Sequence, residues 1–476
     1  MTLTETTLLQ ALSAHPTWMS LQFLAAVTGG TEVEIEPSLA ALRQQGRIEW
    51  NSAPPGFYRL ASGSAEDALD ALAPAERAAL HRRLADFLTA QPSPDNFAAL
   101  LSFHHHQIAA ACLLERRFNE ALALSREALA WAERSADNEI LELRLGELAD
   151  LYFHWGYFQD AEQAYRRALA ILESAGGAPQ AWVRAAQSLA AALAEQGKYG
   201  AALALLETCR GKLDPEKFPL ETGVSELQLA QWHIATGGLR EAEQNLKAVE
   251  DLSASADLSG LQPYLQLQRG KLEVVSGRLA AAFRIFAEAA EGLERQNDLA
   301  GKLEVMLSVS APLLEHSLLR EAQSLIGQLA GWEELKEFPA LEHSVHLRRL
   351  ALGAFSGTWA EEDLELLAQD DTKIGRAEDW LLFWFHLSLA ARRLGNQTNV
   401  EIFLKRARRI ADRIAEFLPS ELRESFFRRP DVARIVRLTE PSVPTRQKVR
   451  ARRSTLAGLA EAGTVAPPQA EKDTEK

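Results

Sequence analysis

Cysteine is almost absent from this chain: Cys112 and Cys209 are the only two among 476 residues. A disulfide framework and a four-thiolate metal site are therefore excluded, and such sparse cysteine is typical of a reducing compartment. The N-terminus lacks a basic segment followed by an apolar stretch, and we expect no uncharged window of membrane-spanning length. These absences predict a cytoplasmic protein without a membrane partner.

The motifs of nucleotide-dependent and nucleophilic enzymes are also missing. The chain contains no GxxxxGK[ST] phosphate loop, no GxGxxG between a strand and a helix, and no nucleophile elbow. Adjacent acids such as Glu361 and Glu362 are typical of solvated helix faces. We therefore expect no enzymatic activity and no cofactor.

Three consecutive histidines, His104, His105 and His106, raise the question of a metal site, with His81, Cys112 or His154 as further ligands. Consecutive positions on a helix point about 100° apart, so three adjacent side chains cannot all face one ion. We expect one of the three to pack in the first repeat and the other two to be solvated, and we predict no metal site.

Charge is distributed unevenly along the chain. The formal net charge is −14, but residues 1–391 carry −22 whereas residues 392–453 carry +10. An acidic body is thus followed by a basic segment. A hydrophobic content of 47% with 24% charged residues is typical of a folded, soluble protein.

A repeat near 40 residues dominates the sequence. Glycines stand two places before a bulky residue, which is followed three places later by alanine, and the same register relates Phe118 to Ala121 and Leu319 to Ala322. Self-similarity at this period indicates an array of helical hairpins. The small residue is required where two helices approach closely, because a larger one would overpack the contact by roughly 1–3 kcal/mol. The repeat positions that we expect to be structurally important are Gly156, Phe158, Ala161, Gly197, Tyr199, Ala202, Gly237, Ala242, Gly277 and Ala282.

These positions resemble the tetratricopeptide repeat, and the second unit, from Leu148 to Ala168, matches it best. The seventh unit departs from the pattern, with Glu362 where alanine is expected after Trp359. A period longer than the usual 34 residues is similar to the superhelical region of bacterial ATPase-type transcription regulators, the signal-transduction ATPases with numerous domains. The resemblance implies a mainly α fold, an α-solenoid whose first helices line a concave groove. Because the phosphate loop is missing, ATP hydrolysis does not carry over.

The N-terminal segment, residues 1–62, is predicted to be a small winged-helix domain. Apolar stripes at helical spacing indicate helices over residues 6–13, 20–28 and 36–45, and a turn-rich stretch between residues 47–50 and 57–60 predicts a β-hairpin. This segment holds only three basic residues, Arg43, Arg47 and Arg59, against five acidic ones. We therefore favour a structural or protein-docking role over DNA binding.

The rest of the chain divides by pattern and composition. We predict a helical connector over residues 63–96, seven to eight tetratricopeptide-like hairpins over residues 97–416, a helical C-terminal cap over residues 417–440 and a disordered tail over residues 441–476.

Basic residues near the C-terminus are the candidate contacts for an acidic surface, which we favour over nucleic acid. The candidates are Arg406, Arg409, Arg446, Lys448, Arg450, Arg452 and Arg453. A solvated outer face at the end of an array explains the helical members of this set equally well.

The sequence thus predicts a non-catalytic interaction scaffold or regulatory adaptor, whose partner is a protein bound as a peptide or helix in the superhelical groove. The alternative is a transcription regulator that contacts DNA through the winged helix or the basic C-terminal segment. Neither the partner nor the pathway follows from the residues.

Overall fold

The computed structural model describes residues 5–52, 55–61, 69–358 and 375–440. Trp359, Glu362, the tail over residues 441–476 and its five candidate basic residues lie outside the described residues. The described part is overwhelmingly helical, which confirms the predicted fold class of a helical repeat array.

The N-terminal unit combines three helices with a small antiparallel sheet in the strand order β1-β3-β2. Met19 pairs with Tyr58, and Tyr58 pairs with Trp50. The third helix begins at Glu32, four residues earlier than predicted, because the backbone N–H and the hydroxyl of Thr31 both donate to the Glu34 carboxylate and cap its first turn. The elements are α1 (Glu5–Ser13), β1 (Met19–Ser20), α2 (Leu21–Thr28), α3 (Glu32–Gln44), β2 (Ile48–Ser52) and β3 (Pro55–Leu60).

Helical hairpins follow, each packing chiefly on its neighbours along the chain. The helices are α5 (Pro74–Thr89), α6 (Ala98–Leu114), α7 (Phe118–Ser135), α8 (Asn138–His154), α9 (Phe158–Ser174), α10 (Pro179–Glu195), α11 (Tyr199–Lys212), α12 (Pro219–Ala235), α13 (Leu239–Ser253), α14 (Gln262–Val275), α15 (Leu279–Arg295), α16 (Leu299–Glu315), α17 (Leu319–Ala330), α18 (Pro339–Ser356), α20 (Ala377–Arg393), α21 (Gln397–Glu416), α22 (Ser420–Arg428) and α23 (Pro430–Thr439). Short 3₁₀ segments are η1 (Pro94–Phe97), η2 (Ser259–Leu261) and η3 (Glu333–Glu337).

The turn inside each hairpin requires a left-handed backbone. Gly156, Gly197, Gly237 and Gly277 all have φ between +77° and +80°, a region that glycine enters without steric cost. Arg116 and Ser317 occupy the equivalent place in two other units, with φ of 60° and 57°. The turn geometry is therefore kept even where the sequence lacks glycine.

The C-terminal helices fold back onto these turns. Gly197 faces Ile414 of α21 and Ala377 of α20, and Gly237 faces the backbone of Ser425 in α22. This arrangement differs from the long open trough expected from the sequence, because α23 and its neighbours lie against earlier hairpins. The reason is the apolar helix α20, whose aromatic residues, Trp380, Phe383, Trp384 and Phe385, are all buried and need cover on every side.

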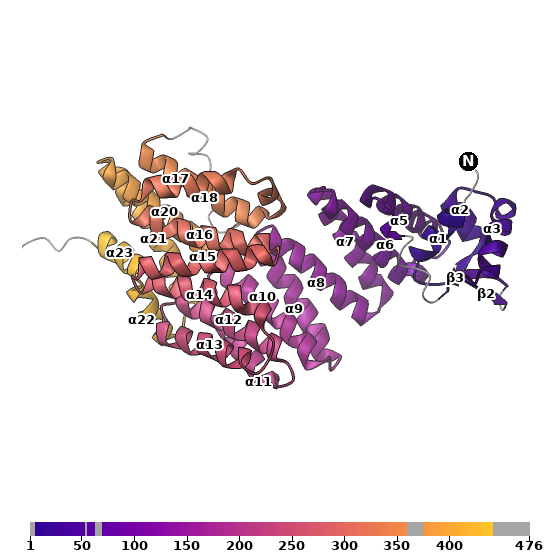
Figure 1. Cartoon of the computed structure of the whole chain (residues 1–476), viewed down its shortest axis with the longest axis horizontal. Helices are drawn as coiled ribbons and strands as arrows, with labels where there is room; N and C mark the ends of the chain where they lie inside the picture. Colours follow the sequence, from indigo (N-terminus) through magenta and orange to yellow (C-terminus); the bar gives the residue numbers. More distant parts are fainter. Residues whose placement is uncertain (1–4, 53–54, 62–68, 359–374, 441–476) are drawn as a thin grey trace, which may run out of the picture.

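Figure 1 shows the resulting shape. The N-terminal unit lies at one end of the long axis, and α5, α6 and α7 join it to a larger body that contains α8 to α23.

The expectation that no uncharged window reaches membrane-spanning length is wrong. Pro94–Leu114 is long and apolar enough to cross a membrane by length and composition, and it is the one such helix in the described ranges. Ala98–Leu114 contains no Asp, Glu, Lys or Arg. Here α6 packs between α5 and α7 as part of a hairpin, with Leu101, Ile108 and Cys112 buried. Only 44% of the apolar window is buried, so α6 is a hairpin helix with one part packed and another part open.

The close approach of α11 to the C-terminal helices yields a test. A Cβ at Gly200 would lie 2.2 Å from the carbonyl oxygen of Phe417, whereas a Cβ at Gly211 on the same helix meets nothing within 4 Å. We expect Gly200→Ala to lower the free energy of unfolding by about 1–3 kcal/mol through overpacking. Gly211→Ala should leave it unchanged or raise it by up to about 1 kcal/mol. Chemical denaturation compares the two, and equal stabilities would contradict the observed packing.

Candidate functional site: a charged chamber between the repeats and the C-terminal helices

The first helices of five successive hairpins and the C-terminal helices line a chamber of about 200 Å³. Its walls come from α10, α12, α14, α16 and α18 on one side and from α20 and α23 on the other. Ten charged side chains contribute to the lining; they are Glu195, Lys271, Glu304, Glu315, Arg348, Arg376, Glu378, Asp379, Arg429 and Asp431.

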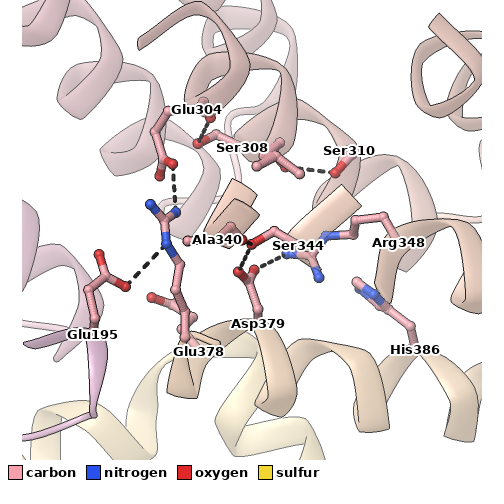
Figure 2. Close-up of polar contacts among 12 residues, drawn as sticks. Glu195, Glu304, Ser308, Ser310, Ala340, Ser344, Arg348, Glu378, Asp379 and His386 are labelled. Carbon is pink, nitrogen blue, oxygen red and sulfur yellow. Dashed lines mark hydrogen bonds and ion pairs between the residues drawn. The ribbon is translucent and has the colours of Figure 1, made fainter. Parts of the chain in front are cut away.

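Arg376, directly before α20, connects two walls of the chamber. Its guanidinium lies 2.6 Å from Glu304 of α16 and 3.3 Å from Glu195 of α10 (Figure 2). Lys271 of α14 adds a second cation 3.3 Å from Glu304. The ion pairs therefore tie three hairpins to the start of α20.

The pKa values of Glu304 and Glu195 are shifted in opposite directions by this environment. Burial would raise the pKa of Glu304, but Arg376 and Lys271 outweigh it and lower the pKa to about 2. Glu195 has only the longer contact, so burial dominates and raises its pKa to about 7. Glu304 is thus a permanent anion, whereas Glu195 changes charge near neutral pH.

A second cluster joins α18 to α20. Arg348 donates to Asp379 at 2.9 Å, and the Ser344 hydroxyl donates to the other oxygen of the same carboxylate at 2.5 Å (Figure 2). All three side chains are buried. Asp379 accordingly neutralises Arg348 and fixes the position of α20 on α18.

Arg429, between α22 and α23, provides the third anchor. It donates to the backbone carbonyl of Ala235 in α12 at 2.7 Å, to Glu378 at 2.8 Å and to both oxygens of Asp431. Burial opposes the charge, but Asp431 and Glu378 outweigh it and raise the pKa of Arg429. The guanidinium therefore stays charged and holds the end of the chain against the fourth hairpin.

We expect Arg429→Ala to destabilise the protein by about 3–5 kcal/mol, because it leaves Asp431 buried without its cation. The adjacent Arg428 pairs with Glu424 on the surface, where both side chains are mostly exposed. Arg428→Ala should change stability by less than about 1 kcal/mol. Thermal and urea unfolding of the two variants measure the contrast, and a small effect of Arg429→Ala would show that this anchor does not hold the C-terminal helices.

The repeat residues chosen from the sequence lie where helices meet. Ala161, Ala202, Ala242 and Ala282 are fully buried. Gly156, Gly197, Gly237 and Gly277 form the turns, and Phe158 is buried at the start of α9. Tyr199 is the member of this set that also reaches the chamber, with its hydroxyl 3.5 Å from Glu378.

The basic candidates that the structure describes are both on α21. Arg406 is half-buried with its guanidinium 4.4 Å from the ring centroid of Trp384, and Arg409 is exposed. Neither lines the chamber. The four cations that do were not singled out from the sequence; they are Lys271, Arg348, Arg376 and Arg429.

The spacing of three polar residues in α16 could have indicated part of the chamber lining. Glu304, Ser308 and Glu315 are spaced by four and seven residues along α16, which places them on one helix face. Arg429 falls within the helical C-terminal cap that was predicted over residues 417–440. Recognising their partners required knowing that α10, α18 and α20 converge.

The histidines form a different arrangement from a metal site. The two nitrogens of His104 lie 3.0 Å from His15 Nδ1 and 3.0 Å from His81 Nδ1, and His15 Nε2 contacts the hydroxyl of Thr17. Among the described residues, no group of three or more His, Cys, Asp or Glu side chains could hold a metal ion. His105 and His106 are half-buried instead of solvated, facing Glu127 and Glu147 respectively. The buried histidines thus connect the N-terminal unit to α5 and α6.

This histidine cluster predicts acid sensitivity. Burial lowers the pKa of His15 and His81 to about 4 and that of His104 to about 2. Because the unfolded chain binds these protons near pH 6.5, the stability contributed by the neutral histidines is present above pH 6.5 and is lost progressively as the pH falls toward 4. His104→Gln should flatten this pH dependence of unfolding, whereas replacement of the exposed His154 by Gln should not. Equal slopes for both variants would contradict the role of the cluster.

Comparison with known proteins supports the fold alone. No family model and no curated protein matches this chain. A solved structure of Rap protein complexed with competence and sporulation factor has a TM-score of 0.53 at 13% identity and covers 72% of this chain and 94% of its own. A signal-transduction ATPase with numerous domains and a tetratricopeptide repeat sensor, from Pyrococcus horikoshii, has a TM-score of 0.37 at 15% identity, covering 89% and 65%.

The apo form of the quorum sensor NprR from B. thuringiensis has a TM-score of 0.38 at 15% identity, covering 78% of this chain and 95% of its own. The similarity to the Rap structure agrees with the fold described above.

Proposed function

We propose that this protein is a non-catalytic scaffold or regulatory adaptor that binds another protein through the first helices of its first two hairpins. The observation that carries the proposal is helix α6, which contains no Asp, Glu, Lys or Arg and yet is only partly covered. A helix of this composition is normally enclosed on all sides. The uncovered part of α6 therefore calls for a partner.

The exposed residues of α6 form one stripe. Leu100, Phe103, Gln107 and Ala110 are half-buried at successive turns, and Leu114 at the end of α6 is 70% exposed. Spacings of three and four residues place them on the same side of the helix.

The neighbouring helix α8 extends this surface. His106 Nδ1 of α6 lies 3.0 Å from Glu147 of α8, so the two helices meet at this point, and Leu143 of α8 is 49% exposed. We call the exposed faces of α6 and α8, with Leu114 and Leu143, the α6–α8 surface. Its apolar character fits an amphipathic helix or another apolar segment of a protein partner.

The chamber is less suited to this role. At about 200 Å³ it is too small for a helix, and its charges largely pair with one another to hold α18, α20 and α23. A polypeptide partner therefore has more room on the α6–α8 surface.

We further propose that the N-terminal unit is a winged helix that packs against protein. Its helix and strand order and the sheet order β1-β3-β2 support the first part. Two of its three cations are already occupied: Arg59 pairs with Glu49 at 2.6 Å and lies over Trp18, and Arg43 lies over Trp50. Because phosphate contacts need available cations, DNA binding is the less favoured function.

A cytoplasmic location remains our proposal, supported by the two free, buried cysteines.

Partner binding can be tested with charge substitutions on the α6–α8 surface. We expect the double variant Leu114→Asp/Leu143→Asp to keep its stability within about 1 kcal/mol, because both side chains are exposed, and to lose its specific partner in affinity capture with mass spectrometry. The matched control is Leu220→Asp/Leu394→Asp, which changes two leucines of similar exposure on α12 and beside α20.

The control should capture the same proteins as the unmodified chain. A partner set that survives the Leu114→Asp/Leu143→Asp change would disprove the assignment of this surface. A salt titration with duplex DNA tests the alternative function, which requires binding that weakens steeply as salt rises.

A further inference from the structure

The two helices of the α6–α8 surface differ in charge. α6 contains no Asp, Glu, Lys or Arg, whereas α8 carries two glutamates next to its exposed leucine. Glu139 stands one helical turn before Leu143, and Glu142 directly precedes it. Glu139 is exposed and Glu142 is half-buried. The apolar stripe of α6 is therefore accompanied by negative charge on α8.

Neither glutamate is neutralised within the described ranges. Glu139 and Glu142 form no ion pair there, whereas Glu147 of the same helix pairs with Arg144 and contacts His106. Burial raises the pKa of Glu142, and no cation offsets this shift. A cation supplied by a partner would remove the cost of leaving this carboxylate partly buried and unpaired.

The cations of adjacent helices are already engaged. Arg184 of α10, the first helix of the next hairpin, lies 2.7 Å from Glu221. Arg126 of α7 donates to the hydroxyl of Tyr152 at 3.0 Å and lies over its ring. These side chains are therefore held by contacts of their own and do not neutralise the acids of α8.

Further acids lie beside the end of α6. Arg116, which follows Leu114 by two residues, pairs with Glu337 of η3 at 2.5 Å. Glu333 and Glu334 of the same 3₁₀ segment are exposed. Acidic groups thus border the α6–α8 surface both on α8 and beside the end of α6.

We propose that the partner of the α6–α8 surface is a basic amphipathic helix. Its apolar stripe packs on Phe103, Leu114 and Leu143, and Lys or Arg residues beside that stripe face Glu139 and Glu142. The inference rests on the proposed function and adds the chemistry of the partner to it. Opposite charges at the rim of an apolar contact speed association and disfavour partners of the same charge.

The surface favours a helical guest over an extended one. An extended peptide gains its main-chain hydrogen bonds by adding a strand to an open sheet edge, and this surface consists of helices. A helix instead presents side chains at spacings of three and four residues, which match the stripe of α6.

The test measures the binding of three labelled synthetic peptides of about 18 residues to the full chain by fluorescence anisotropy. All three share one leucine stripe at helical spacing, and their polar faces consist of Lys, Gln or Glu. We expect the Lys peptide to bind, the Gln peptide to bind about three- to tenfold more weakly and the Glu peptide to bind weakest. Raising the salt from about 50 to about 300 mM should weaken the Lys peptide and leave the Gln peptide nearly unchanged, because salt screens exposed charges.

Variants locate the contact. Glu139→Lys/Glu142→Lys should weaken the Lys peptide roughly tenfold or more and strengthen the Glu peptide, and the milder Glu139→Gln/Glu142→Gln should weaken the Lys peptide about three- to tenfold. The matched control, Glu241→Lys/Glu243→Lys, makes the same change in net charge at two exposed positions of α13 and should bind as the unmodified chain does. Circular dichroism verifies that each variant is folded.

A leucine pair separates this inference from the proposed function. Leu114→Ser/Leu143→Ser keeps the charge unchanged and should weaken all three peptides. If it does so while the Lys and Gln peptides bind the unmodified chain equally well, the surface stands and the basic partner is disproved. If neither the leucine pair nor the glutamate pair changes the affinity for the Lys peptide, binding lies elsewhere and both proposals fail.

Two further results would overturn the inference alone. An equal loss in the Glu241→Lys/Glu243→Lys control would show that the net charge of the whole chain attracts the peptide. Displacement of the Lys peptide at equal affinity by a peptide of residues 446–460 would assign the surface to the basic tail of this chain in place of a partner protein.

Discussion

The contact between the C-terminal helices and the turns of earlier hairpins is the constraint on which the rest of this structure depends. α22 reaches the fourth hairpin only because Gly237 leaves no side chain between its own backbone and Ser425. Gly200 gives the same clearance to Phe417. These glycines thus serve two purposes: Gly237 forms a left-handed turn, and both residues allow two backbones to meet. Without that approach the array would end as an open superhelix and no chamber would form.

Buried ion pairs then favour one arrangement of the helices among those that apolar packing permits. Arg376, Arg348 and Arg429 each extend from the C-terminal third of the chain to a carboxylate or carbonyl that is fixed by burial. Buried ion pairs add little net stability compared with apolar residues, because desolvation offsets their attraction. Breaking one is nevertheless costly, so such pairs favour one arrangement of helices over its competitors. The pairs therefore account for a defined closure, while apolar burial around Trp380, Trp384 and Phe426 supplies the stability.

The sequence predicted those features that depend on local spacing. Gly156, Tyr199 and Ala242 indicated hairpins at a 40-residue period; in the structure Gly156 lies in a turn, Tyr199 begins α11 and Ala242 is buried in α13. The expectation for α6 was wrong, because its 17 residues without Asp, Glu, Lys or Arg fill one hairpin helix and reach spanning length together with η1.

The chamber could not be predicted because its residues are far apart in the chain. Glu195 and Arg376 are separated by 181 positions, and no periodicity relates them. His15 lies in the loop between α1 and β1, His81 in α5 and His104 in α6, and only His104 was part of a visible cluster in the sequence. Local patterns determine helices and turns, whereas the pairing of buried charges depends on how many repeats complete the superhelix before α20 begins.

Pulsed electron paramagnetic resonance would measure the closure most directly, with spin labels at Glu241 and Glu424 in a chain whose two cysteines have been replaced. Both positions are exposed, one at the start of α13 and one on α22, near the contact of Gly237 with Ser425. The account predicts one short and narrow distance distribution. A long or broad distribution would show that the C-terminal helices do not rest on the turns, and the chamber would then lose its wall.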